Sequence, residues 1–319
     1  MKNINRREFN RVFAAGLASL AIPSVLSSCG TAAAIPAQLR GSAAAKDARQ
    51  LGIVLGAQTY SFRDRSLDAA ISAMQQLGIK SCELWEGHVE PRELQWARNQ
   101  PPAEAKAKRE KLAEWKKTVS MDYFIDIREK LEAADISIQA YNGSIKDAAT
   151  DEDIDLVFRI ARALGTDTVT SSATVSVMKR IDPYARQYGI RCAMHNHAHV
   201  SRPNEFSTPE TFSRGMEGLS DLIWVNLDIG HFTAANLDPV AYIKENHQKI
   251  HSIHVKDRKR DQGENMPFGE GDTPIGEVLR LIRDNKYPIP ANIEYEYQGT
   301  DTLVEMQKCI DYCKAELNK

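Results

Sequence analysis

Short apolar runs of strand length alternate with helical patterns along most of this chain, and this alternation constrains the fold more than any other feature. The helical patterns include residues 67–77, 154–164 and 275–283, where apolar residues recur at helical spacing. Strands separated by helices form parallel sheets through right-handed crossovers. The β-branched, apolar runs that we expect as strands are residues 53–60, 80–85, 137–142, 167–173, 191–197, 223–229, 250–257 and 291–297.

Eight such strand-and-helix units favour closure of the sheet into a (β/α)8 TIM barrel. Three of the helical patterns end on a glycine just before the next strand, at Gly78, Gly165 and Gly189. Glycine adopts the left-handed conformation that closes a helix, so the recurrence predicts a repeated helix-to-strand corner. Residues 51–319 are long enough for one barrel, which typically takes about 250 residues.

The N-terminal segment, residues 1–29, has the composition of an export signal. A basic start is followed by an apolar stretch at 12–26 that is short for a membrane span. Arg6-Arg7 resembles a twin-arginine motif, and the residues up to Cys29 (LSSC) resemble a lipobox, which predicts cleavage before Cys29 and its lipidation. The alternative is an ordinary signal peptide with a chance cysteine. Residues 30–50, rich in alanine, would form a tether.

The net charge and the N-terminal motifs limit which kinds of partner the protein can have. The net charge of −2 argues against nucleic acid as a ligand. We expect an exported lipoprotein of the periplasm or cell envelope, which contacts the membrane only through the lipid on Cys29.

The other cysteines are interpreted as small buried hydrophobic residues, in preference to a disulfide or metal role: Cys82, Cys192, Cys309 and Cys313.

Polar residues near the C-terminal ends of the late strands indicate a metal site. These residues are His195 in AMHNH, Asp228 in LDIGH, His254 in HVKD and Glu294 in IEYE. The C-terminal ends of barrel strands meet at one mouth, so the four side chains could converge there. Two imidazoles and two carboxylates suit a divalent cation, and Mn, Co, Ni, Zn and Mg all accept such a set.

Each of these residues also has a simpler interpretation. Asp228 could cap the following helix, and His254 could be a satisfied core histidine. Period-two alternation places Glu294 and Glu296 on the same face of their strand, toward the barrel axis if the neighbouring tyrosines pack outward. Two inward carboxylates repel each other unless a cation lies near them, which favours the metal interpretation.

Two long segments follow strands and would therefore lie on the catalytic face of a barrel. The first runs from residue 85 to residue 121 and is helical in its second half; the second, residues 257–274, is rich in glycine and charged residues. Loops at this face shape substrate pockets, so His88 and Arg260 are expected to contact substrate. The alternative for both segments is solvated surface.

Together these motifs resemble the xylose-isomerase-like TIM barrels, a grouping that includes sugar isomerases and epimerases, inosose dehydratases and apurinic endonucleases. The resemblance covers essentially all of residues 51–319 and is specific as a set. It implies that Asp228, His254 and Glu294 bind the divalent ion. It further implies that His231 contacts substrate or assists proton transfer, that Glu83 lines the pocket, and that Lys256, beside His254, contacts substrate or supports a metal ligand.

One departure from the family pattern concerns the fifth strand. Many epimerases of the grouping have a glutamate there, as a ligand and as one of two opposed bases, whereas this chain has His195. The HNH triplet resembles a subset of exported members. We expect His195 to be the ligand and His197 to contact substrate, although the two roles could be exchanged.

The expected chemistry begins with removal of an α proton next to a carbonyl group. A divalent cation stabilises the resulting enediolate, and a base tuned near neutral pH completes the site. Glu294 or Glu296 would be the base, with His197, His231 or Lys256 as the acid. Because an exported protein meets few phosphorylated sugars, the expected substrate is a non-phosphorylated carbohydrate.

Three functions from different classes fit these residues. The first is a metal-dependent sugar isomerase or epimerase, and the second is a lyase or hydratase acting on a 3-keto-sugar or keto-glycoside. A neutral histidine in place of one of the two opposed carboxylates disfavours two-base epimerisation and makes one-sided chemistry more plausible. The third function is a non-catalytic carbohydrate-binding lipoprotein, against which the inward carboxylates argue. Endonuclease activity fits least, given the acidic balance and the expected export.

Overall fold

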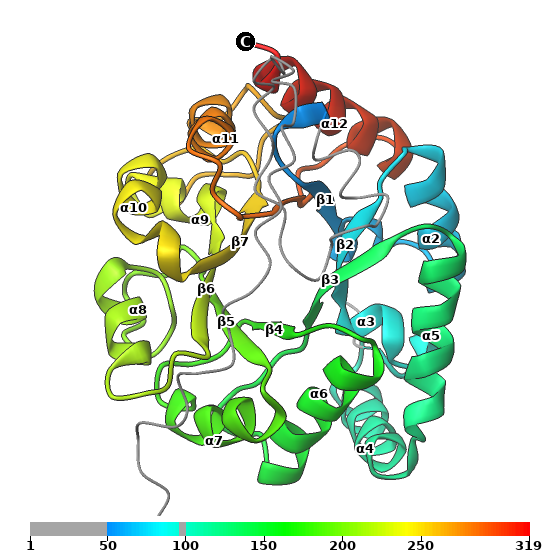
Figure 1. Ribbon diagram of the computed structural model, residues 1–319. Helices are drawn as coiled ribbons and strands as arrows, with labels where there is room; N and C mark the ends of the chain where they lie inside the picture. Colours follow the sequence, from blue (N-terminus) through cyan, green and yellow to red (C-terminus); the bar gives the residue numbers. More distant parts are fainter. Residues whose placement is uncertain (1–49, 96–99) are drawn as a thin grey trace, which may run out of the picture. The chain divides into compact units, whose positions relative to one another are not determined.

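The computed structural model describes residues 50–95 and 100–319 of the chain. Within these residues the strands close into one parallel barrel in the order of the sequence, and helices surround it (Figure 1). The predicted (β/α)8 barrel is thereby confirmed. The strands are β1 Leu55–Gln58, β2 Ser81–Trp85, β3 Ser137–Asn142, β4 Thr168–Ser171, β5 Arg191–His195, β6 Ile223–Asp228, β7 Ile250–Val255 and β8 Ala291–Ile293.

The strands lie where the sequence predicts them, but several end earlier. We expected strands to residues 197 and 297, whereas β5 ends at His195 and β8 ends at Ile293. After each of these strands the chain leaves the ladder and enters a loop at the barrel mouth. Glu294 still donates its backbone N–H to the carbonyl of Val255 at 3.0 Å, so its backbone stays beside β7.

The surrounding helices begin and end on the signals that the sequence carries. Ser66 and Thr150 cap helices through their side chains, and Thr150 forms a reciprocal capping box with Asp153. The helices are α2 Leu67–Gln76, α3 Glu86–Val89, α4 Pro102–Thr118, α5 Met121–Ala133, α6 Asp151–Ala163, α7 Met178–Tyr188, α8 Pro209–Met216, α9 Ile229–Ala234, α10 Pro239–Asn246, α11 Ile275–Asp284 and α12 Thr302–Leu317, with short 3-10 turns η2 Thr59–Phe62, η3 Arg92–Leu94 and η4 His247–Lys249.

The glycine corners have the expected backbone. Gly78, Gly165 and Gly189 have φ values of 70°, 74° and 64°, in the left-handed region that side chains with a Cβ disfavour. Each glycine follows a helix and leads into the next strand. The same left-handed glycine conformation therefore makes the helix-to-strand corner at three places in the barrel.

The main core lies between the barrel and the helix ring. Tyr295 and Tyr297 are buried on the outer side of the barrel, where the Tyr297 hydroxyl donates to Glu305 of α12 at 2.8 Å. Their outward packing turns Glu294 and Glu296 toward the barrel mouth, as the alternation predicts. The expected burial of four cysteines is also confirmed: Cys82, Cys192, Cys309 and Cys313.

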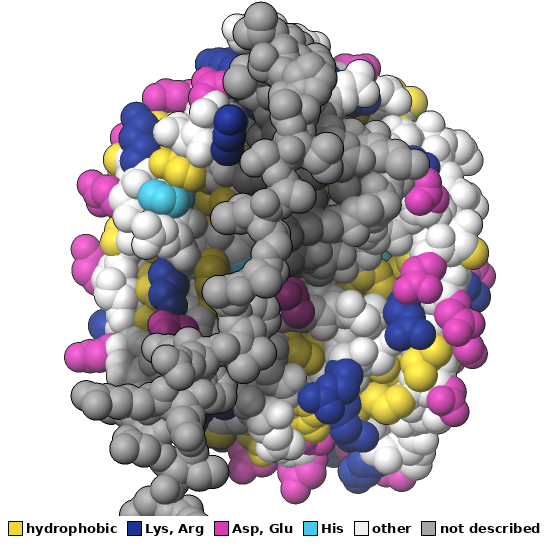
Figure 2. Space-filling view, viewed as in Figure 1, with side chains coloured by type: hydrophobic (Ala, Val, Ile, Leu, Met, Phe, Trp, Pro, Cys, Tyr) yellow, Lys and Arg dark blue, Asp and Glu magenta, His cyan; other side chains and the backbone are white. Residues whose placement is uncertain are grey.

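The predicted export signal at 1–29 and the tether up to residue 49 lie outside the described residues. Among residues 50–95 and 100–319, no helix combines the length and apolar character that a membrane crossing requires. On the face drawn in Figure 2, basic and acidic side chains are interspersed over the outer helices.

Candidate metal centre

The residues predicted as metal ligands come together at the mouth formed by the C-terminal ends of the strands. His195 and Asp228 are the last residues of β5 and β6, and His254 lies one residue before the end of β7. Asp228 pairs with His254 in the register of β6 and β7. Glu294 follows β8 directly. All four side chains are buried.

His254 lies between two carboxylates. Its Nε2 is 2.9 Å from Glu83, and its Nδ1 is 3.1 Å from Glu294. Burial alone would lower the pKa of His254, but these two carboxylates raise it well above its usual value. A cation bound at Nδ1 would take the place of that proton, while Nε2–H would continue to donate to Glu83.

The two carboxylate oxygens of Asp228 have different roles: one caps a helix, and the other points into the candidate site. Its Oδ1 accepts the backbone N–H of His231 at 2.7 Å and so caps α9. Its Oδ2 is buried and has no hydrogen bond of acceptable geometry to any residue that the structure describes, although the Lys256 ammonium lies 3.0 Å away. The capping role that the sequence allowed is therefore real, and it leaves the other oxygen for a ligand.

His195 presents a neutral imidazole to the mouth. Burial, followed by the nearby His254, lowers its pKa. Its Nδ1 is 2.9 Å from the side-chain oxygen of Asn226, which fixes the proton on Nδ1 and leaves Nε2 as an acceptor. The same Asn226 donates to Glu83 at 3.1 Å, so one amide connects β5, β6 and β2.

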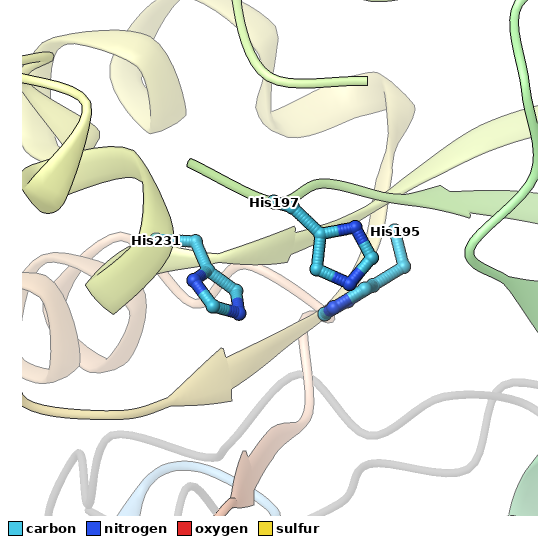
Figure 3. Close-up of side chains that lie close together, drawn as sticks. All are labelled: His195, His197 and His231. Carbon is cyan, nitrogen blue, oxygen red and sulfur yellow. The ribbon is translucent and has the colours of Figure 1, made fainter. Parts of the chain in front are cut away.

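His197 and His231 both lie close to His195 (Figure 3). Their ring centroids lie 5.1 and 6.0 Å from that of His195 and 5.3 Å from each other. Burial lowers the pKa of His197 to about 2 and that of His231 well below its usual value. Neutral imidazoles can bind a metal or exchange hydrogen bonds with a substrate, so this side of the mouth carries no charge.

Lys256 is the positive centre of the site. Its ammonium lies 3.0 Å from Asp228, 2.9 Å from Glu294 and 2.5 Å from Glu296. Burial opposes its charge, yet the three carboxylates raise its pKa well above the usual value. The inward glutamates are thus partly neutralised by a lysine as well as by any bound cation.

These residues fit a divalent cation. One ligand atom from each of His195, Asp228 and His254 lies within 4.8 Å of the others. Both histidines have their second nitrogen held by a hydrogen-bond partner, and Asp228 has a spare buried oxygen. Glu294 would complete a set of two nitrogen and two oxygen donors. The second group of donors at the same spacing is His195, His197 and His231.

Glu83 lies beneath the mouth and does not line it. We expected a pocket residue, but its side chain is fully buried and accepts from Gln58 at 2.8 Å and from Thr170 at 2.7 Å. Burial opposes ionisation of Glu83, and His254 together with Thr170 holds its pKa below the usual value. Its position suits a carboxylate that orients His254 better than one that contacts substrate.

Two expected substrate contacts lie away from this cluster. His88 is buried in α3, with Nε2 3.3 Å from the backbone oxygen of Phe62, and its ring packs edge-on against Trp85. Arg260 is exposed in the loop after β7. The residue of that loop that reaches the site is Arg258, whose guanidinium lies 2.7 Å from Nδ1 of His231. Sequence alone gives no signal that selects one arginine over the other.

Comparisons with known proteins agree with this fold. The chain is 30% identical over 99 residues to the L-ribulose-5-phosphate 3-epimerase UlaE of Escherichia coli, a match that covers 30% of this chain and 35% of that protein. The chain thus matches only about a third of the length of its curated relatives.

Solved structures resemble a larger part of the chain. IolI, solved with a zinc atom bound, is 14% identical with a TM-score of 0.61, covering 83% of this chain and 97% of that one. A D-tagatose 3-epimerase-like protein is 16% identical with a TM-score of 0.58, covering 83% and 98%. A sugar phosphate isomerase/epimerase from Parabacteroides distasonis is 15% identical with a TM-score of 0.57, covering 83% and 96%.

The family comparison covers most of the barrel. Residues 71–314 match the family described as "Xylose isomerase-like TIM barrel". The match begins in α2 and ends in α12, so it includes every strand from β2 to β8 and all four expected ligands. This chain belongs to the xylose isomerase-like TIM barrel family.

Proposed function

We propose that the protein is a divalent-metal-dependent sugar isomerase or epimerase that acts on a non-phosphorylated carbohydrate through α-proton abstraction and an enediolate intermediate. The observation that carries the proposal is the convergence of His195, Asp228, His254 and Glu294 at one mouth, with a spare buried oxygen on Asp228. The epimerases among the similar proteins support the same class of reaction.

The four convergent residues would hold the cation. When bound, a divalent ion supplies positive charge that stabilises negative charge developing on a substrate oxygen. Asn226 and Glu83 keep the two imidazoles in the orientation that binding requires. Residues beneath the mouth would therefore contribute to affinity without contacting either the ion or the sugar.

Glu296 is our candidate for the base. It is partly exposed at the mouth, whereas Glu294 is engaged by both His254 and Lys256. Lys256, 2.5 Å from Glu296, can donate a proton to a substrate oxygen. His231, 3.3 Å from Lys256, and the neighbouring His197 can pass protons as neutral imidazoles.

A second candidate function is a lyase acting on a keto-glycoside. The observation that favours it is the distribution of carboxylates, because Glu294, Glu296 and Asp228 all belong to the β6–β8 side of the mouth. The β5 side presents His195 and His197, and Glu83 lies beneath the site. One face carries the base and the other carries neutral imidazoles, which suits one-sided elimination better than two-base epimerisation.

We further propose that the protein is exported and anchored by a lipid on Cys29, as the N-terminal motifs predict. This location would expose the barrel to free sugars and glycosides, since phosphorylated sugars are largely cytosolic. The proposed partner is therefore a small carbohydrate, with no nucleic acid. Labelling with a radioactive fatty acid would test the anchor, and a Cys29→Ala variant should lose the label.

The test of the catalytic proposal combines metal analysis with proton exchange. The purified protein should contain a divalent cation, and it should exchange the α proton of a free ketose or keto-glycoside in heavy water. Conservation of substrate mass would identify an isomerase or epimerase, whereas release of water or an alcohol would identify a lyase. A protein that binds no added divalent cation and exchanges no proton would refute both functions.

A further inference from the structure

Arg258, in the loop after β7, extends to the mouth and contacts His231. Its Nη1 lies 2.7 Å from Nδ1 of His231. A guanidinium group stays protonated in proteins and can only donate hydrogen bonds. Nδ1 of His231 is therefore an acceptor that carries no proton, and the single proton of the neutral ring lies on Nε2. The arginine thus determines which ring nitrogen is a donor.

The loop after β7 holds this guanidinium in place. Its Nε and Nη2 donate to the backbone oxygen of Gly263 at 3.1 and 2.5 Å. The backbone of Arg258 is held as well, because its N–H donates to Thr273 at 3.0 Å and its carbonyl oxygen accepts from Asp272 at 2.9 Å. The planar guanidinium therefore loses little further freedom when it binds His231.

A glycine brings His231 close to the end of β7. Gly230 lies in the first turn of α9 and directly precedes His231. A Cβ atom at Gly230 would lie 2.7 Å from the backbone oxygen of Lys256 and 2.9 Å from the Cβ of Lys256. Only glycine therefore lets this turn of α9 pack so closely against the residue that follows β7.

A second donor, Lys256, also lies near the ring. Nε2 of His231 is 3.3 Å from the Lys256 ammonium and 3.6 Å from Oδ2 of Asp228. A neutral imidazole has a single acceptor nitrogen, so Arg258 and Lys256 cannot both donate to it. In the part of the chain that the structure describes, Nη1 of Arg258 has His231 as its only acceptor. The protons of Lys256 have three closer acceptors, at 3.0, 2.9 and 2.5 Å: Asp228, Glu294 and Glu296.

We propose that Arg258 is a positioning residue that fixes His231 as a hydrogen-bond donor, through Nε2–H, to the substrate oxygen on which negative charge develops. Donors held in place before the reaction stabilise such charge. The inference rests on the proposed function and assigns His231 one role at that site, as a donor.

The same hydrogen bond separates the two candidate groups of metal ligands. Nδ1 of His231 is bound by Arg258 and Nε2 carries the proton, so this ring has no free lone pair for a cation. The group formed by His195, His197 and His231 therefore lacks one of its ligands. The cation is left to the group that contains His195, Asp228 and His254.

Nitrogen-15 NMR of the histidine rings tests the tautomer in the full-length protein, first with a chelator and then with Zn²⁺. A His231→Gln variant identifies the signals of His231. In wild type these signals should show an unprotonated Nδ1 and a protonated Nε2. In Arg258→Met the remaining donor near the ring is Lys256, so the proton should move to Nδ1. The tautomer ratio should change at least about tenfold, as expected for loss of one hydrogen bond from a charged donor.

Lys259→Met is the matched control, because it removes a positive charge from the same loop and leaves Arg258 in place. Lys259 is 3.5 Å from Asp272, and the ring signals of His231 should stay as in wild type. A wild-type ring with a protonated Nδ1, or an unchanged tautomer in Arg258→Met, would overturn the proposal. Coordination of Zn²⁺ by His231, seen as a large displacement of a ring-nitrogen signal, would also overturn it.

Kinetics tests the role of this donor in the reaction. A hydrogen bond that strengthens as the oxygen gains charge acts on kcat, so Arg258→Met should lower kcat for α-proton exchange about tenfold and change KM little. A change confined to KM would overturn the donor role. A wild-type protein that exchanges no proton, with the tautomer shift intact, would instead refute the proposed function and leave the tautomer assignment standing.

Discussion

Two regions of the molecule bury carboxyl groups, and they shift the pKa values of these groups in opposite directions. At the mouth, Lys256 and His254 overcome the effect of burial and hold the pKa of Glu294 well below its usual value. At the first residue of α3, burial and the neighbouring Glu90 raise the pKa of Glu86 to about 7. Cations that outweigh burial therefore separate a carboxylate suited to metal binding from a carboxyl group whose proton is lost only near neutral pH.

The largest effect expected at the mouth follows the change Asp228→Asn. Asparagine can still cap α9 through its side-chain oxygen, so the fold should persist, but the negative charge and the spare oxygen are lost. Metal content and α-proton exchange should both disappear. Elemental analysis and exchange in heavy water measure the two effects, and an unchanged melting curve controls for folding. A variant that keeps metal and exchange would remove Asp228 from the site.

The next effect concerns Lys256, whose positive charge compensates the carboxylates at the mouth. Lys256→Met leaves three carboxylates without their shared ammonium and should cost about 3–5 kcal/mol of unfolding free energy in the metal-free protein. Addition of a divalent cation should recover part of this loss, because the ion supplies replacement charge. Denaturant unfolding with and without added cation measures both quantities. Equal stability of variant and wild type would contradict the compensating role.

A smaller effect is expected beneath the mouth. Glu83→Gln keeps the shape of the side chain but removes the negative charge next to Nε2 of His254. Metal affinity should fall about 10- to 100-fold, as is typical when a partner of a metal-binding histidine is lost. Competition with a fluorescent chelator measures the affinity. Glu264→Gln, in the exposed part of the loop after β7, is the control and should leave affinity unchanged.

The smallest effect is expected at Glu86, the first residue of α3. Because the folded pKa of Glu86 lies near 7, above its usual value of 4.5, its favourable contribution to stability is present at low pH and declines as pH rises through this window. Glu86→Gln removes the titration, so its melting temperature relative to wild type should increase between pH 5 and pH 8. Exposed Glu277→Gln should show no such trend. A constant difference for Glu86→Gln would show that the carboxyl group titrates normally.

Much of the barrel could be predicted because its signals are local. Apolar runs and helix-ending glycines mark the elements, and the alternation of residues 291–297 correctly predicted that Glu294 and Glu296 point inward. Strand ends were less predictable, since β5 stops at His195 where the chain leaves its ladder. That boundary depends on pairing with β4 and β6, which a single strand's sequence does not encode.

The site was predictable where strand position determines it and unpredictable where loops do. His195, Asp228 and His254 converge as expected, because parallel strands bring their ends together. Arg258 was missed in favour of Arg260, since the path of the loop after β7 depends on Asp257. The Asp257 carboxylate accepts backbone N–H groups of Gly269 and Gly271 at 2.8 and 3.0 Å. Such long-range loop contacts leave no periodic trace in the sequence.

The divided carboxylate of Asp228 has a consequence for ion selection. Because Oδ1 accepts a hydrogen bond from the first turn of α9, coordination of an ion by both oxygens would remove the cap of that helix. Large ions such as calcium favour six to eight oxygen donors and often use both oxygens of one carboxylate. A mouth that offers one oxygen from Asp228, beside two imidazole nitrogens, therefore discriminates by geometry in favour of smaller transition-metal ions.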